Sequence, residues 1–142
     1  MNEQEIQPFE GFTEMDRGAW CGLTIDEIGK DMMARFDKCD ESVTPEGGEN
    51  YPGLKQRVLA ARDELLALTD EGNASAVVSH LQVTRSMLSD AMDVSVTDMS
   101  TLKVATASVS VVDYDTATGT QTVHFQSFKP EAGLQKSFDG AN

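Results

Sequence analysis

A run of small and β-branched residues ends in a histidine at Ala76-Val77-Val78-Ser79-His80, and a helix-compatible stretch, 82–91, follows at once. Buried parallel strands in α/β proteins have such near-continuous apolar sequences, and helices follow them after short loops. The pattern therefore predicts a buried parallel strand over residues 75–79. Its carboxyl end would present Ser79 and His80 to the crevice where α/β proteins bind ligands. A histidine there can exchange protons near neutral pH or hold an anion.

Two amphipathic segments predict helices before this strand. Thr24 and Glu27 form a capping box, and the apolar residues that follow predict one helix with its apolar face on Ile25, Ile28, Met32 and Phe36. After an acidic, turn-rich loop, Pro52 stands at a plausible first helical position. The best helical pattern of the chain starts there, with apolar residues three and four positions apart at Leu54, Val58, Ala61, Leu65 and Leu68.

Three further segments predict strands, which makes the fold class α/β. Side chains of residues 9–15 alternate between two faces, which favours a short strand. Residues 104–114 and 120–128 flank a turn and are predicted to pair as a terminal hairpin. Such a sheet is thin, because buried parallel strands normally have neighbours on both sides. We expect a loose N-terminus over residues 1–8, a domain over 9–128 and a disordered tail over 129–142.

Composition and charge exclude several kinds of partner. Lys and Arg total 11 against 24 Asp and Glu, and the net charge of −13 argues against nucleic acid or an anionic membrane. No apolar stretch approaches the ~20 residues of a membrane helix. Cys21 and Cys39 lack metal-ligand spacing and indicate reduced thiols. We expect a cytoplasmic protein, or an organellar one if the natural N-terminus is longer, because residues 1–7 look like no targeting peptide.

Four segments, taken in order, resemble a known family. Residues 12–28 (FTEMDRGAWCGLTIDEI) are similar to a signature of the histidine phosphatase superfamily, the phosphoglycerate mutase-like and fructose-2,6-bisphosphatase-like proteins. Residues 47–50 (GGEN) are similar to its Gly-Glu-Ser, residues 77–80 (VVSH) to its Val-Val-Ser-His strand end, and residues 104–111 (VATASVSV) to the next strand. The resemblance covers residues 9–128. It implies part of a three-layer, phosphoglycerate mutase-like sheet with flanking helices and a C-terminal hairpin.

The resemblance also implies a chemistry, phosphoryl transfer in two steps through a phosphohistidine, for which we expect no cofactor and no metal. Glu14 matches the family's proton donor, and His80 matches its second histidine, a ligand of the phosphate oxygens. Ser79, Leu81 and Glu49 are our candidates for substrate binding, and the helix start after His80 would add N–H donors. The implied substrate is a small phosphorylated metabolite, a phosphomonoester such as a phosphoglycerate or a sugar phosphate.

One departure from the family pattern matters most. The family's nucleophile lies in an Arg-His-Gly motif, which this sequence lacks, and its only histidines are His80 and His124. The nucleophile strand and a phosphate-binding arginine would then precede Met1, which accounts for both the thin sheet and the missing positive charge. We therefore expect a phosphatase- or phosphomutase-family protein with little or no activity as given. Cys21, Asn50 and Thr106 replace usual family residues and leave the substrate class open.

Two other functions stay open at this point. The chain could be a non-catalytic module that completes its sheet by pairing an exposed edge with a partner chain or a second copy. An unrelated ligand could also bind at His80. For single residues, we expect Trp20 to be a packing anchor, Arg85 to pair with an acidic neighbour, and His124 to lie on the surface.

Overall fold

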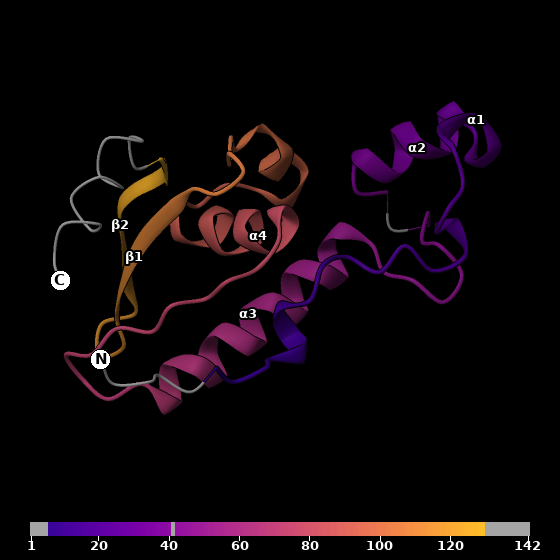
Figure 1. Cartoon of the computed structure of the whole chain (residues 1–142). Helices are drawn as coiled ribbons and strands as arrows, with labels where there is room; N and C mark the ends of the chain where they lie inside the picture. Colours follow the sequence, from indigo (N-terminus) through magenta and orange to yellow (C-terminus); the bar gives the residue numbers. More distant parts are fainter. Residues whose placement is uncertain (1–5, 41, 130–142) are drawn as a thin grey trace, which may run out of the picture.

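Helices and one β-hairpin make up the computed structural model, which describes residues 6–40 and 42–129 (Figure 1). The predicted tail, apart from Lys129, and the first part of the predicted loose N-terminus lie outside the described residues. The α-helices are α1 (Ile25–Ile28), α2 (Lys30–Asp37), α3 (Tyr51–Leu68) and α4 (Leu81–Ala91). The strands are β1 (Val109–Asp115) and β2 (Thr120–Phe128), and short 3-10 turns are η1 (Glu10–Phe12), η2 (Gly18–Trp20) and η3 (Val96–Thr101).

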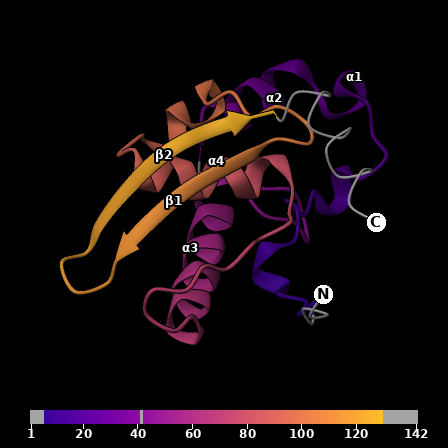
Figure 2. The ribbon, with the colours of Figure 1, turned by 60° about the vertical axis from the view of Figure 1, so that its left-hand side comes forward.

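The helix α3, predicted from its periodicity, is the longest helix of the described structure, and α4, η1 and η3 pack against it. Asn50 caps it, because its side-chain oxygen accepts the Gly53 N–H at 2.9 Å, and Pro52 lies in the first turn. Leu54 and Val58 on its inner face are fully buried. In both ribbon views α4 lies between α3 and the hairpin (Figure 1, Figure 2). No helix in the described part of the chain is long and apolar enough to cross a bilayer.

The core gathers around the inner faces of α3 and α4 and the start of the chain. Trp20 is a packing anchor, as predicted: its ring meets Phe36 edge-on with centroids 5.2 Å apart, and Phe36 in turn packs on Tyr51 at 5.1 Å. The buried cluster consists of Phe12, Met15, Phe36, Val43, Tyr51, Leu54, Val58, Ala61, Val83 and Met99. This cluster joins segments that are far apart in sequence.

The helix predicted after Thr24 is divided in two. The capping box forms as predicted, with the Thr24 hydroxyl accepting the Glu27 N–H and the Glu27 carboxylate accepting the Thr24 N–H. The helix then breaks at Gly29, whose φ of 98° lies in the left-handed half of backbone space. The predicted apolar face is wrong for two residues, because Ile25 and Met32 are exposed and only Phe36 is buried.

The terminal hairpin is confirmed, with a shorter first strand than predicted. Strand β1 starts at Val109 instead of residue 104, because the chain turns at Ala107, where φ is 53°. The two strands pair antiparallel, starting at the turn with Asp115 opposite Thr120. The register becomes irregular toward the other end of the hairpin, between Val109 and Val112. Asp115 closes the turn by accepting the N–H groups of residues 117 and 118.

The other two predicted strands do not form. Residues 9–15 contain the 3-10 turn η1, and residues 75–79 run as an extended segment with no ladder partner among the described residues. A strand is stable only when its backbone groups pair with a neighbour, and the described sheet holds β1 and β2 alone. Val78, predicted to be buried, is therefore 98% exposed.

Truncation of the α3 inner face should destabilise the protein strongly. We expect Leu54→Ala to lower the free energy of unfolding by about 3 kcal/mol, because it leaves a cavity at a fully buried site. Leu68→Ala is the matched control in the same helix. Leu68 is 65% exposed, so its truncation should change stability by less than about 0.5 kcal/mol. Urea unfolding measures both, and equal midpoints would contradict the observed packing.

Candidate active site

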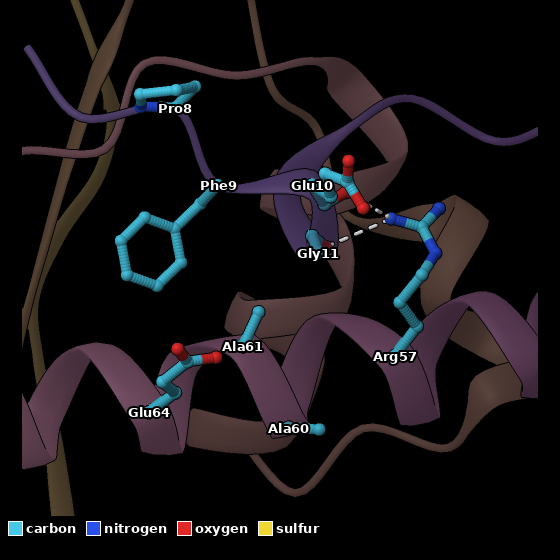
Figure 3. A pocket seen from close by; sticks show the side chains of 8 residues that line it. All are labelled: Pro8, Phe9, Glu10, Gly11, Arg57, Ala60, Ala61 and Glu64. Atoms are coloured by element: carbon cyan, nitrogen blue, oxygen red, sulfur yellow. Dashed lines mark hydrogen bonds between the residues drawn. The ribbon is translucent and has the colours of Figure 1, made fainter.

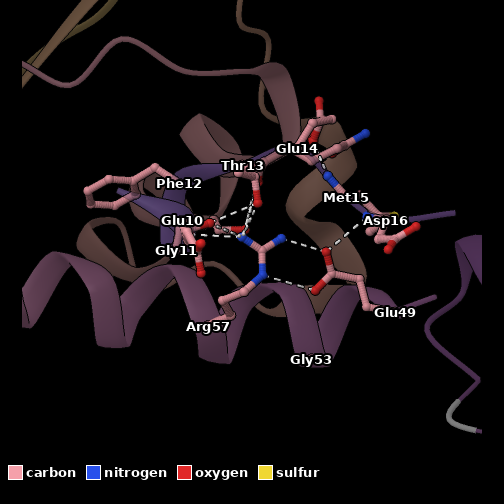
Figure 4. A network of polar contacts seen from close by, with 12 residues as sticks. Glu10, Gly11, Phe12, Thr13, Glu14, Met15, Asp16, Glu49, Gly53 and Arg57 are labelled. Carbon is pink, nitrogen blue, oxygen red and sulfur yellow. Dashed lines mark hydrogen bonds and ion pairs between the residues drawn. The ribbon is translucent and has the colours of Figure 1, made fainter. Parts of the chain in front are cut away.

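Arg57, in the middle of α3, holds the segment that carries Glu14 (Figure 4). Its Nη1 donates to the carbonyl oxygens of Gly11 at 2.9 Å and of Thr13 at 3.1 Å. The rest of the guanidinium faces the Glu49 carboxylate, with Nη2 to Oε1 at 2.5 Å and Nε to Oε2 at 3.2 Å. This forked pairing fixes direction as well as distance, because each of two guanidinium nitrogens donates to a different carboxylate oxygen.

Glu49 also binds the backbone of Asp16 through two hydrogen bonds. Its Oε1 accepts the Asp16 N–H at 3.0 Å, and its own N–H donates to the Asp16 carbonyl at 2.9 Å. The Glu49 side chain is only 19% exposed, and both of its carboxylate oxygens are engaged. We predicted Glu49 as a substrate-binding residue, and the structure places it within a frame around Glu14.

Glu14 lies between the two anchored residues of this segment. The carbonyl of Thr13 is held by Arg57, and the N–H of Asp16 is held by Glu49. The Glu14 side chain is half-buried, and its Oε1 accepts the Met15 N–H at 2.8 Å. The carboxyl group is thus turned back onto its own backbone.

Ser79 brings the His80 segment beside the Glu14 segment. Its hydroxyl donates to the Phe12 carbonyl at 2.6 Å, across 67 positions of sequence. The segments before His80 and before Glu14 are thus linked without the predicted strand. The Ser79 hydroxyl, our second substrate-binding candidate, is used in this bond.

His80 is the N-cap residue of α4, and its side chain is exposed and makes no capping bond. Its carbonyl accepts the N–H and the hydroxyl of Thr84 at 3.0 and 2.9 Å. The first N–H groups of α4, including that of Leu81, have no partner inside the helix, and a helix start favours anions. Leu81 itself is 39% exposed at this end.

Comparison with known proteins identifies the family. A sequence model of the histidine phosphatase superfamily (branch 1) matches residues 1–126. The chain belongs to the histidine phosphatase superfamily. Two curated relatives, an uncharacterized protein of Mycobacterium bovis and the bifunctional protein Rv2228c of Mycobacterium tuberculosis, are each 32% identical over 108 residues. That alignment covers 74% of this chain, and the chain spans 29% of the length of these relatives.

Solved structures show the fold of this histidine phosphatase-family chain. Bacillus stearothermophilus YhfR superposes with a TM-score of 0.74 at 23% identity, over 86% of this chain and 61% of that one. The α-ribazole phosphatase of Shigella flexneri superposes with a TM-score of 0.70 at 18% identity, over 89% of this chain and 62% of that one. The predicted phosphoglycerate mutase-like α/β fold is confirmed, and it corresponds to part of each solved chain.

Arg57 is the residue of this family member that sequence reasoning missed. A usable signal exists: Arg57 is three positions after Leu54 and one before Val58, so it falls on the buried stripe of α3. A cation within an apolar stripe needs acceptors close by, since burying an unpaired charge is costly. The carboxylate of Glu49, in the loop before α3, is the acceptor that meets this need.

Two further polar residues lie away from Glu14. Arg85 has no acidic partner among the described residues, contrary to our prediction, and its Nε donates to the Leu102 carbonyl at 2.9 Å. His124 lies on the hairpin surface as predicted, with its Nε2 2.6 Å from the Asp113 carboxylate. The second histidine of the sequence thus stands in a separate, exposed pair.

The cysteines are free thiols. Cys21 is exposed, whereas Cys39 is half-buried and its Sγ lies 3.5 Å from the Val96 carbonyl. Burial raises the pKa of the Cys39 thiol, and the nearby Asp37 carboxylate adds to this, so the reactive thiolate is disfavoured. Within the described residues, no group of three His, Cys, Asp or Glu side chains is placed to hold a metal.

Two open hollows lie beside α3. One, of about 390 Å³, lies between Phe9 and α3 (Figure 3). Its floor is Ala60 and Ala61, and Glu64 stands at one side. The other, of about 460 Å³, separates the last turns of α3 from the hairpin turn. Neither hollow is lined by Glu14 or His80.

Removing the Ser79 hydroxyl should loosen the link between the two site segments. We expect Ser79→Ala to lower the free energy of unfolding by about 1 kcal/mol, because the Phe12 carbonyl loses its donor. The control is Ser100→Ala, because Ser100 is exposed and should respond little. Urea unfolding measures both variants, and an unchanged Ser79→Ala midpoint would show that this bond contributes nothing.

Proposed function

We propose that this protein acts on small phosphomonoesters through a phosphohistidine, with Glu14 and His80 as its contribution to the site. Membership of the superfamily supports phosphatase- or mutase-type chemistry. The observation that carries the proposal is the Ser79 bond to the Phe12 carbonyl, which sets the His80 segment beside the Glu14 segment. The two residues that match the family's phosphate ligand and proton donor thus lie on adjacent segments.

Each residue has a defined part in the proposed reaction. A histidine nitrogen forms a bond to phosphorus while the bond from phosphorus to the leaving oxygen breaks. The Glu14 carboxyl gives its proton to that leaving oxygen. His80, when protonated, and the free N–H groups at the start of α4 hold the other phosphoryl oxygens. Water, or a second acceptor hydroxyl in a mutase, then breaks the phosphorus–nitrogen bond.

The attacking histidine is the part that these 142 residues do not supply. His80 matches the phosphate ligand, and His124 is paired with Asp113 on the hairpin. We propose that the nucleophile comes from polypeptide beyond these residues, in the same protein or in a partner. The chain as given is then a phosphate-binding half with little or no turnover, because loss of the nucleophile removes most of the rate enhancement.

The two histidines make the binding test simple. We expect inorganic phosphate or vanadate to shift the imidazole NMR signals of His80 and to leave those of His124 unchanged. His80→Ala should weaken binding by about tenfold or more, the loss of a charged hydrogen bond, whereas His124→Ala should not. Shifts at neither imidazole would refute the phosphate site. Turnover of p-nitrophenyl phosphate by the 142-residue chain would refute its inactivity.

A second candidate function is favoured by the exposed edge. The extended residues 75–79 have no strand partner in the described structure, and Val78 is 98% exposed. On β1 and β2, Val109, Phe125 and Phe128 are also about half exposed. An unpaired, apolar edge is a template for an added strand. We propose, as the alternative, a non-catalytic module that completes its sheet with a partner chain or a second copy.

A charge at this edge should block such pairing. If the chain alone forms a dimer in sedimentation experiments, we expect Val78→Asp to make it monomeric, because an added strand would bury the carboxylate. Ile25→Asp is the control, at an exposed apolar position in α1. A monomeric wild-type chain, or a dimer that survives Val78→Asp, would contradict self-pairing through this edge.

A further inference from the structure

The backbone of residues 11–16 is organised by side chains from elsewhere in the chain. Three successive carbonyl groups each accept from a side chain: Arg57 donates to those of Gly11 and Thr13, and Ser79 donates to that of Phe12. No ladder of strand bonds holds this segment in the described structure. Its conformation, and hence the placement of Glu14, depends on these donors.

We propose that Arg57 is a positioning residue, which acts through Glu49 and the carbonyls of Gly11 and Thr13 to set where the Glu14 carboxyl points. The inference rests on the proposed role of Glu14 as proton donor. Arg57 has no part in it as a phosphate ligand, because its guanidinium is already occupied by Glu49 and by backbone oxygens.

The geometry explains why an arginine serves here. One guanidinium reaches two kinds of acceptor at once: Nε and Nη2 face the Glu49 carboxylate, and Nη1 faces the Gly11 and Thr13 carbonyls. A lysine ammonium is a single compact donor group without this planar fork. It could keep the ion pair or the carbonyls, but not both in the same orientation.

The close packing of the segment on α3 supports the same role. A Cβ added at Gly11 would lie 2.3 Å from the Cβ of Ala61, so the chain sits directly on the helix at this point. Arg57 is one turn before Ala61 on that helix. The close contact of Gly11 with α3 therefore places the Gly11 carbonyl within reach of the Arg57 guanidinium.

Arg62 provides a matched control on the same helix. Its side chain is also largely buried, at 12% exposure, and it pairs with Asp63 and Asp90. None of its hydrogen bonds reaches residues 11–16 of the described structure. A change that only weakens the fold should therefore appear in Arg62→Lys as much as in Arg57→Lys.

The experiment reads the Glu14 carboxyl through its own neighbour. The Met15 N–H donates to Glu14 Oε1, so the Met15 amide NMR shift should follow ionisation of this carboxyl during a pH titration. We expect Arg57→Lys to diminish that pH-dependent shift. Hydrogen exchange at Met15 and Asp16 should accelerate about tenfold or more, as for a lost charged hydrogen bond. Arg62→Lys should leave both readouts as in the wild type.

A second variant tests the same frame from its other side. Glu49→Gln keeps an oxygen for the Asp16 N–H but removes the charge that holds Arg57, and it should reproduce the Arg57→Lys changes. It also decides the question if Arg57→Lys does not fold. Unchanged Met15 and Asp16 signals in the folded variants, or equal changes in Arg62→Lys, would overturn the proposal. Failure of His80 to respond to vanadate would instead refute the phosphate site and leave the Met15 readout intact.

Discussion

The ion pair between Arg57 and Glu49 is the constraint on which the site depends. Arg57 lies on the stripe of α3 that also carries Leu54 and Val58, so its charge must find acceptors within the fold. It finds them in Glu49 and in the carbonyls of the segment before Glu14. The same bonds hold the backbone next to Glu14 in a stretch that has no strand partner in the described structure.

Stabilisation and orientation arise here from shared contacts. The Asn50 cap starts α3 directly after Glu49, so the position of the carboxylate is tied to the start of the helix. Phe12 and Met15, on either side of Glu14, belong to the buried cluster. The Glu14 segment is thus held by apolar packing on one side and by Arg57 on the other. A mutation in either set of contacts should alter both stability and the site.

The parts of the structure that were predicted correctly depend on residues close together in the sequence. The capping box at Thr24, the periodicity of α3 and the turn at Asp115 are all set by residues within a few positions. The strand predicted at residues 75–79 was wrong in the described structure because pairing is non-local, and Val78 instead faces outward. His80 was predicted as a candidate from the apolar run that precedes it, and Glu14 from a family resemblance. The Arg57 frame was missed, because the alternation of residues 9–15 indicated a strand and not a segment bonded by side chains.

The Glu14 half and the His80 half of the candidate site differ in how many hydrogen bonds hold them in place. Around Glu14, four backbone groups are held by side chains, whereas the His80 imidazole is exposed and receives no hydrogen bond from the described residues. A proton donor is effective only when its direction is fixed before the reaction, since misplacement by about 1 Å can cost about a hundredfold in rate. A phosphate ligand can be ordered by the charge of the phosphate itself. For the proposed function, the rigid half is therefore the one that must be oriented before the reaction, and the open half is the one that a bound phosphoryl group would order.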